Sequence, residues 1–535
     1  MLNYIWLALL FIGIATAVTT DISDTAANKF QNGEKLYVLT KFDHSKIDSE
    51  KVFNAGIYVS TKVFNDFYRT KEKENILQTA KFSYNKEEKK FAVFIEVDEK
   101  SPAIWKEMAS ASGNEKDLTG KIILRERIDS VYYTASLILE AVSFVKMKDV
   151  TNAAIDYAAN AVKIALGLIG IMALWLGIMK IAEQAGLISI IAKSVKPLTK
   201  FLFPDVPHDH PAIGSIIMNI SANMLGLGNA ATPFGLKAMA ELDSLNPEKG
   251  TATNAMCTFL AINTAGLTLI PATAIAIRAS AGSSDPTIII GTSFFGALCA
   301  TLTGIAAAKT LEKFSIPNFN FAAWFKSNLK FLSAFLITAA AIVFLFTSGA
   351  LSLFEGGMIK SIIQIVSTLA IPLIILTFVT YGVFKKVKLY EVFVEGAKEG
   401  FNVAVKIIPY LVAMLVAIGI FRAGGAMDFL VLILSPVTNW IGMPAEALPM
   451  ALMRPLSGSG SLGIMSEIIS VHGADSFIGI LVSTIMGSTE TTFYVLALYF
   501  GTVGIKRTRH AVTAGVLADI AGILAALFIV KLLFG

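Results

Sequence analysis

Residues 213–236 read IGSIIMNISANMLGLGNAATPFGL. This stretch is uncharged and longer than the ~20 apolar residues that a helix needs to cross a bilayer. It also contains glycines, Pro233 and a series of polar side chains, which interrupt helices and leave backbone groups that hydrocarbon cannot satisfy. We therefore expect the stretch to face a wet cavity inside the protein. The alternative is that its small residues only allow close helix packing.

The rest of the chain has the composition of a membrane protein. Of its 535 residues, 54% are hydrophobic and 16% are charged, against ~25% charged residues in soluble domains. Membrane-length uncharged runs cover residues 1–20, 251–277, 286–308, 331–354 and 361–384, with shorter runs at 164–179 and 407–421, and runs with one acid at 476–505 and 511–530. Placing the basic loops in the cytoplasm gives nine crossings of the bacterial inner membrane. The net charge of +5 is too small to indicate nucleic-acid binding.

Residues 21–150 form an exception to this pattern. Residues 19–150 hold 21 of the 45 basic and 21 of the 40 acidic residues. Residues 91–97 and 121–124 have the pattern of strands, residues 82–91 that of a hairpin, and residues 61–69 and 130–146 that of helices. The sequence thus predicts a soluble α+β domain that lies outside the cytoplasm. It is inserted after a first helix at residues 1–20, which we expect not to be cleaved.

The two halves of the membrane part resemble each other. A pattern of small residues and prolines recurs with gaps that agree within one residue. Its positions are Ala185, Gly186, Pro197, Thr199 and Pro211 in the first half and Ala423, Gly424, Pro436, Thr438 and Pro449 in the second. With nine crossings the two copies run in opposite directions. Inverted repeats with broken or re-entrant helices, enclosing a site near the midplane, are a recurrent plan of secondary transporters.

Charges are rare in the second copy, and three stand out. Arg454 begins RPLSGSGSLG, Glu490 lies within GSTETTFY, and Asp519 lies in the last apolar run. A charge at the bilayer centre costs about 2.5–3.5 kcal/mol, so these side chains should face inward and find partners. We expect Arg454 and Glu490 to pair, either as a structural ion pair or as part of a site.

These residues define a hypothetical solute cavity. Its predicted lining is Asn219, Asn223, Asn229, Asn263, Arg454, Ser457, Ser459, Thr489, Glu490 and Thr491. No nucleotide-binding motif is present, so transport would use an ion gradient, with Glu490 and Asp519 as candidates for proton coupling. No cofactor, metal site or catalytic set is predicted. The glycines at 458, 460 and 463 lack the strand of a dinucleotide fold.

Longer motifs resemble the spore maturation proteins A and B, which carry the nucleoside-recognition Gate domain. The A-like motifs are MLNYIW at 1–6, LWLGIMKIAEQAG at 174–186, NMLGLGNAATPFGLK at 223–237 and FLAINTAGLTLIP at 259–271; the B-like motifs are YGVFKK at 381–386, EGAKEG at 395–400, RPLSG at 454–458 and GSTETTFYVLALYF at 487–500. The resemblance implies a fusion, with an A-like Gate domain at residues 151–315 and a B-like one at 325–535.

The resemblance implies a membrane fold related to parts of nucleoside and ferrous iron transporters, but it supplies no substrate-binding residues. Transport of a small polar solute is the first expectation. The second is a non-transporting anchor or sensor whose residues 21–150 bind a cell-envelope partner. An intramembrane enzyme is a third reading, for which only Glu490 and Asp519 come close to a catalytic pair.

Overall fold

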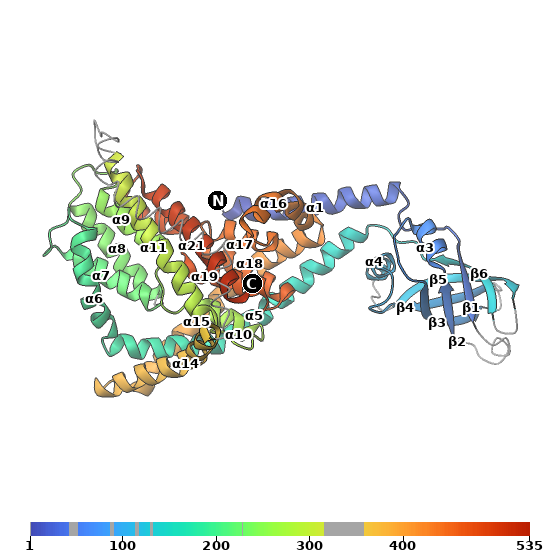
Figure 1. Cartoon of the computed structure of the whole chain (residues 1–535), viewed down its shortest axis with the longest axis horizontal. Helices are drawn as coiled ribbons and strands as arrows, with labels where there is room; N and C mark the ends of the chain where they lie inside the picture. Colours follow the sequence, from blue (N-terminus) through green and yellow to red (C-terminus); the bar gives the residue numbers. More distant parts are fainter. Residues whose placement is uncertain are drawn as a thin grey trace. The chain divides into compact units, whose positions relative to one another are not determined.

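The structure is a computed structural model that describes residues 2–41, 52–85, 90–112, 117–128, 132–226, 228–314 and 358–535. It contains two compact units (Figure 1). The larger unit comprises residues 1–3, 158–415 and 431–535, and the smaller one comprises residues 4–157 and 416–430.

The inserted segment of the smaller unit folds as a closed antiparallel barrel. Its strands follow one another in chain order, and the last pairs with the first, so that Val38 lies opposite Ala135. The strands are β1 (Leu36–Lys41), β2 (Val52–Val59), β3 (Ile76–Asn85), β4 (Lys90–Glu96), β5 (Asp117–Arg127) and β6 (Tyr132–Leu139), and the helices are α3 (Thr61–Tyr68) and α4 (Ala103–Ser112). Closing the sheet removes the unpaired edges that would otherwise promote aggregation.

Alternating side chains build the core of the barrel. The rings of Phe53 and Phe82 stack with centroids 5.7 Å apart, on neighbouring strands β2 and β3. Helices α3 and α4 add Phe64 and Trp105 to the same core, and both are fully buried. The Trp105 indole donates a hydrogen bond to the Tyr68 hydroxyl at 3.2 Å, so its only polar atom is satisfied.

The barrel overturns the predicted fold class. The prediction of an all-α membrane protein with a soluble α+β insertion is wrong, because the insertion is a closed six-stranded antiparallel β-barrel. The helix predicted at residues 130–146 is the main local error, since residues 132–139 form strand β6. There Tyr133, Ala135 and Leu137 point into the core in alternation. Pairing with β1 and β5 decided this segment, because strand preference depends on tertiary context.

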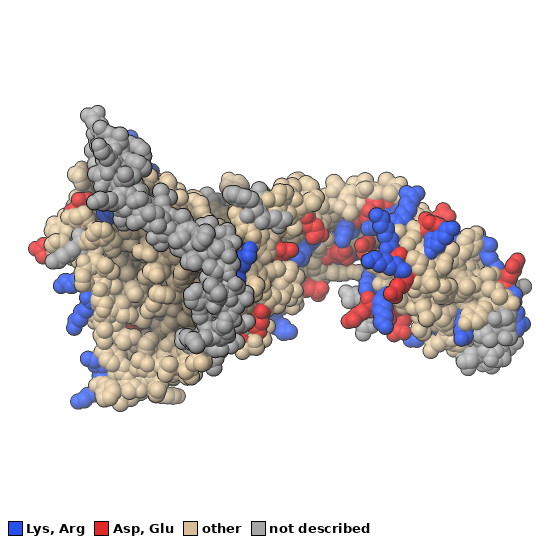
Figure 2. Space-filling model, in the orientation of Figure 1, with Lys and Arg blue, Asp and Glu red and all other residues tan. Residues whose placement is uncertain are grey.

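The larger unit, together with α1, is helical and apolar. Among the described residues, 6 helices are long and apolar enough to cross a membrane. They correspond to α1 (Leu2–Ala26), α5 (Val145–Gln184), α11 (Ile289–Phe314), α15 (Leu389–Ala423), the pair α19 (Phe477–Ser488) and α20 (Thr492–Thr502), and α21 (Ala511–Phe534). Figure 2 shows that charged side chains gather on the barrel, whereas most of the visible helical surface is uncharged. The chain is a multi-pass membrane protein.

The remaining helices are shorter or less apolar. They are α6 (Leu187–Leu202), α7 (Pro211–Met224), α8 (Gly228–Ser244), α9 (Asn254–Ala265), α10 (Ala272–Ser280), α14 (Met358–Phe384), α16 (Ala426–Ile441), η2 (Ala445–Ala447), α17 (Leu448–Met453) and α18 (Gly458–His472). The crossing predicted at residues 251–277 is split into α9 and α10, because Gly266 ends α9 with a φ of 60°. The crossing predicted at residues 331–354 lies outside the described residues.

Several apolar segments of the larger unit are interrupted by breaks between two short helices, and backbone groups at one break form hydrogen bonds with those at another. The Leu269 amide donates to the Met224 carbonyl at 2.8 Å, which joins the break after α9 to the break after α7. The Glu490 amide, between α19 and α20, donates to the Thr264 carbonyl at 2.9 Å. Backbone groups freed by the breaks are therefore satisfied within the protein, as a dry surrounding requires.

His510, just before α21, gives the fold a pH dependence. Burial, with the positive charges of Arg509 and Lys309, lowers its pKa from the usual 6.5 to about 4. Below pH 6.5 the unfolded chain takes up a proton that the folded chain excludes, so this contribution to stability is complete above pH 6.5 and is lost as the pH falls towards 4. We expect the unfolding temperature of the wild type to fall more steeply between pH 7.5 and 5 than that of His510→Gln. Parallel slopes in thermal scans of the two proteins would contradict this.

Candidate functional site

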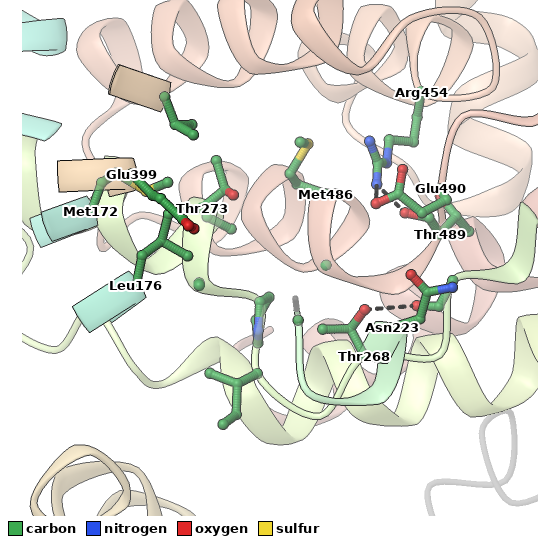
Figure 3. Close-up of a pocket in the computed structure, with 18 of the residues that line it drawn as sticks. Met172, Leu176, Asn223, Thr268, Thr273, Glu399, Arg454, Met486, Thr489 and Glu490 are labelled. Atoms are coloured by element: carbon green, nitrogen blue, oxygen red, sulfur yellow. Dashed lines mark hydrogen bonds and ion pairs between the residues drawn. The ribbon is translucent and has the colours of Figure 1, made fainter. Parts of the chain in front are cut away.

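The broken helices surround a cavity of about 240 Å³ in the larger unit (Figure 3). Helix α5 supplies Met172 and Leu176 to its wall, α15 supplies Glu399, and the break between α19 and α20 supplies Thr489 and Glu490. The remaining lining residues are Lys180, Glu183, Asn223, Gly226, Gly266, Thr268, Ile270, Pro271, Ala272, Thr273, Ala274, Val403, Arg454, Met486 and Gly487. Both halves of the chain contribute, and the walls combine apolar side chains with a few polar groups, as is usual for ligand sites.

An ion pair marks one end of the cavity. Arg454 follows α17, and its guanidinium lies 3.5 Å from the Glu490 carboxylate, so the pair predicted from the sequence is present. The guanidinium also donates to the Thr489 carbonyl in the adjacent break. The Arg454 side chain is 3% exposed, whereas that of Glu490 is 49% exposed. Glu490 therefore presents its charge to the cavity, and Arg454 holds it from behind.

The close approach of Glu490 requires a glycine opposite it. A Cβ on Gly266 would lie 2.7 Å from Cγ of Glu490, and its φ of +60° also disfavours any other residue. The break after α9 therefore shapes the wall on which Glu490 rests.

A second charged group lies at another part of the cavity wall. The Lys180 ammonium on α5 lies 3.4 Å from Glu183 and 3.6 Å from Glu399 on α15. The carboxylate side chains are 34% and 48% exposed, but that of Lys180 is 19% exposed. None of these three residues was predicted to line a site, although they lie in the motifs at 174–186 and 395–400. The charges that directly follow the apolar run at 164–179 were the available signal for Lys180 and Glu183.

Asparagines predicted as cavity residues form a buried hydrogen-bonded chain. Asn223 donates to the side-chain oxygen of Asn263 at 3.0 Å, and the Tyr499 hydroxyl donates to that oxygen at 3.4 Å. Asn219 donates to the Tyr499 hydroxyl at 3.3 Å and to the Ala231 carbonyl at 2.8 Å. Only Asn223 of these residues lines the cavity. These hydrogen bonds join asparagines of the first membrane half to Tyr499 of the second half. Tyr499 was not among the predicted site residues.

The other predicted lining residues have structural contacts. Ser457 caps α18 by accepting from the Gly460 amide at 3.0 Å, and Ser459 lines a neighbouring hollow. Thr491 is buried at the N-terminus of α20. Asp519, which was predicted as a candidate for proton coupling and not as a lining residue, is buried and accepts from the Thr492 hydroxyl at 2.6 Å. The side chain of Asn229 lies outside the described part of the chain.

Of the predicted set, the structure therefore places Asn223, Arg454, Thr489 and Glu490 at one cavity. Their role in binding a solute stays a prediction. Within the described ranges, no group of three or more His, Cys, Asp or Glu side chains is placed to hold a metal ion. The His210 side chain accepts from the Ala212 amide at 3.2 Å and caps α7.

Comparison with known proteins matches both membrane halves to one family. The sequence model of the Gate family, described as nucleoside recognition, matches residues 165–281 and 404–506. The chain is 53% identical over 174 residues to spore maturation protein B of Bacillus subtilis (strain 168), covering 32% of this chain and 98% of that protein. It is 47% identical over 161 residues to spore maturation protein A of the same organism, covering 30% of this chain and 81% of that protein.

Two relatives that are separate proteins thus each match a part of this chain with about 50% sequence identity. The two Gate matches fall in different halves of the membrane part. The chain belongs to the spore maturation protein A and B family, as a fusion of an A-like and a B-like part.

Proposed function

We propose that the protein transports a small polar solute across the bacterial cytoplasmic membrane and does not catalyse a reaction. The observation that carries this proposal is the Arg454–Glu490 pair facing a cavity among membrane-spanning helices. Ionisable groups are costly in a membrane and mark solute or ion pathways when they face a shared interior. The cavity is also built from helix breaks, which is the usual construction of midplane binding sites in secondary transporters.

The charges of the cavity indicate which solutes suit it. Its lining holds two cations, Lys180 and Arg454, and three carboxylates, Glu183, Glu399 and Glu490. The carboxylates are the more exposed members of both ion-paired groups. A solute would therefore meet acceptors and negative charge first, which favours neutral or cationic molecules over anions. Because the matched family is described as nucleoside recognition, an uncharged nucleoside is the first probe.

The driving force would be an ion gradient, since no nucleotide-binding motif is present in the sequence. Glu490 is the residue best placed to couple ion and solute, because its carboxylate is accessible from the cavity and fixed by Arg454. The excess of basic residues in the segments 193–200, 309–313, 385–406 and 506–509, which lie at helix ends or in loops, favours their placement in the cytoplasm. With these segments in the cytoplasm, the order of membrane crossings proposed from the sequence puts residues 21–150 outside the cytoplasm.

Uptake into proteoliposomes tests the proposal. Purified protein, reconstituted and given inward proton or sodium gradients, should accumulate radiolabelled uridine more than protein-free vesicles do. Uridine monophosphate serves as the matched anionic solute and should not accumulate, because it would face the exposed carboxylates. No uptake of uridine, or of a cationic solute such as putrescine, under either gradient would contradict transport of this class.

The second candidate function is partner binding by the barrel. A groove on the barrel is lined by Tyr37, Tyr58 and Arg125, among other residues, and the Arg125 guanidinium lies over the Tyr37 ring at 4.6 Å. Tyrosine and arginine are enriched in protein interfaces and at their energetically dominant positions. A cell-envelope protein would be the partner, with the membrane part as its anchor.

A deletion separates the two candidate functions. Replacing residues 27–144 by a short flexible linker joins α1 to α5 and removes the barrel. Because the cavity is lined entirely by the larger unit, we expect this variant to retain full uptake in proteoliposomes. Loss of uptake in a variant that remains folded and monodisperse would show that the barrel takes part in transport.

A further inference from the structure

Asp519 on α21 lies beside the helix break that carries Glu490 and contacts the first residue of α20, Thr492. Its side chain is fully buried, and one carboxylate oxygen accepts from the Thr492 hydroxyl at 2.6 Å. Among the described residues, the other carboxylate oxygen has no hydrogen-bond partner. The hydroxyl of Thr489, which is 2% exposed, is likewise unpartnered. Buried polar atoms are nearly always satisfied, so two orphans on facing segments need an explanation.

Two glycines bring the break onto the same face of α21. Gly515 and Gly522 lie one turn before and one turn after Asp519. The methyl group of Thr489 and the Ser488 carbonyl approach Gly522, and the hydroxyls of Thr492 and Thr264 would each lie 3.2 Å from a Cβ on Gly515. Four oxygen-bearing groups therefore adjoin this face of α21: the Asp519 carboxylate itself, the hydroxyls of Thr264 and Thr492, and the Ser488 carbonyl. The unpartnered hydroxyl of Thr489 belongs to the side chain whose methyl group contacts the same helix.

We propose that Asp519, Thr489 and Thr492 form a binding site for a dehydrated sodium ion at the break between α19 and α20. Carboxylate, hydroxyl and carbonyl oxygens are the ligands that hard cations prefer. A single carboxylate balances one positive charge, whereas a divalent ion would remain uncompensated in a dry surrounding. The C-terminal end of α19 at Ser488 adds a negative partial charge.

Neighbouring cations do not already occupy this role. The guanidinium of Arg454 is directed to Glu490 and to the Thr489 carbonyl. Arg454 and Glu490 both act electrostatically on Asp519, in opposite directions. An ion that binds both Asp519 on α21 and oxygen atoms of residues 488–492 would hold that segment in place. This is the segment that carries Glu490 to the cavity. Sodium and solute would then favour each other's binding, since such coupling is reciprocal.

Thermal unfolding of the purified full chain in detergent tests the site without a known solute. At constant ionic strength and pH 7.5, replacing choline chloride by sodium chloride should raise the unfolding temperature saturably. Asp519→Asn keeps the volume and the bond from Thr492 but removes the charge, so it should lose the sodium-dependent shift. Thr489→Val should weaken the apparent sodium affinity by about tenfold or more. Glu467→Gln and Thr301→Val, which alter a buried carboxylate and a buried hydroxyl elsewhere, should keep the wild-type response.

Direct binding of radioactive sodium to the wild type provides a second measurement, should Asp519→Asn fail to fold. An equal response to sodium and choline, a sodium shift that persists in Asp519→Asn, or a response to pH alone would each overturn the site. The last outcome would assign Asp519 to proton binding. The inference stands apart from the proposed transport, because sodium binding without uptake would contradict only the transport proposal.

Discussion

Replacing Glu490 with glutamine should abolish gradient-driven uptake while the protein remains folded. Glutamine keeps the size of the side chain and a hydrogen-bond acceptor for Arg454, but it removes the charge that the cavity exposes. Because the Glu490 side chain is half-exposed, its charge contributes little to stability. In the variant, Arg454 can still donate to the Thr489 carbonyl, so we expect only a small effect on stability. Initial uptake rates in proteoliposomes, normalised to reconstituted protein, measure the effect.

Glu446→Gln is the matched control, because Glu446 lies in η2 within the same unit but does not line the cavity. It should transport at the wild-type rate. Exchange of solute in the absence of a gradient separates binding from coupling, and Glu490→Gln is expected to retain part of this exchange. If Glu490→Gln accumulates solute as fast as the control, Glu490 is not the coupling residue.

Replacing Gly400 with leucine should strongly destabilise the helical unit. Gly400 on α15 lies against α5, where a Cβ would be 2.5 Å from the Met172 carbonyl and 2.7 Å from Cα of Ala173. Both contacts are with backbone, which cannot move without separating the two helices. Gly396 one turn earlier and Gly177 on the facing helix make similar contacts, so the interface follows the small-residue plan of membrane helix pairs. Overpacking costs about 1–3 kcal/mol in soluble cores, and a leucine against backbone should exceed that range.

Gly170→Leu on α5 is the matched control, since no atom lies within 4 Å of a Cβ placed there. The unfolding temperature of the two purified variants in the same detergent gives the comparison, and the control should stay within a few degrees of the wild type. Because Met172 and Val403 both line the cavity, Gly400→Leu should also lose uptake. A Gly400→Leu protein with the stability of the control would show that α5 and α15 do not pack as described.

The sequence predicted those parts of the site that are constrained by the cost of placing unpaired charges and polar groups in hydrocarbon. A charge within an apolar run must find a partner, so Arg454 and Glu490 could be paired from their positions alone. Asn223 could be placed at a cavity for a related reason, because the glycines around it interrupt the helix. Lys180, Glu183 and Glu399 were missed because they sit near the ends of apolar runs, where charges are also compatible with a surface loop.

The insertion shows the opposite case. Strands β4 and β5 were predicted from alternating residues, but the segment of β6 was predicted as a helix. Residues such as Ala135 and Leu137 are compatible with either structure, and their position between β1 and β5 decided the outcome. Closure of the barrel depends on the pairing of β1 with β6, and no local pattern reports a contact between segments so far apart in the chain.

The sequence by itself determined that this protein lives in a membrane, that it joins two related membrane halves, and that its few intramembrane charges must meet partners. These features follow from the high cost of exposing polar groups to hydrocarbon, which acts on each residue wherever the chain folds. Only the tertiary structure decided that the insertion is a barrel, that a second charged group shares the cavity with Glu490, and that Asp519 lies among oxygen atoms of a helix break. Those features depend on which distant segments meet, and that choice is made by the packing of the whole molecule.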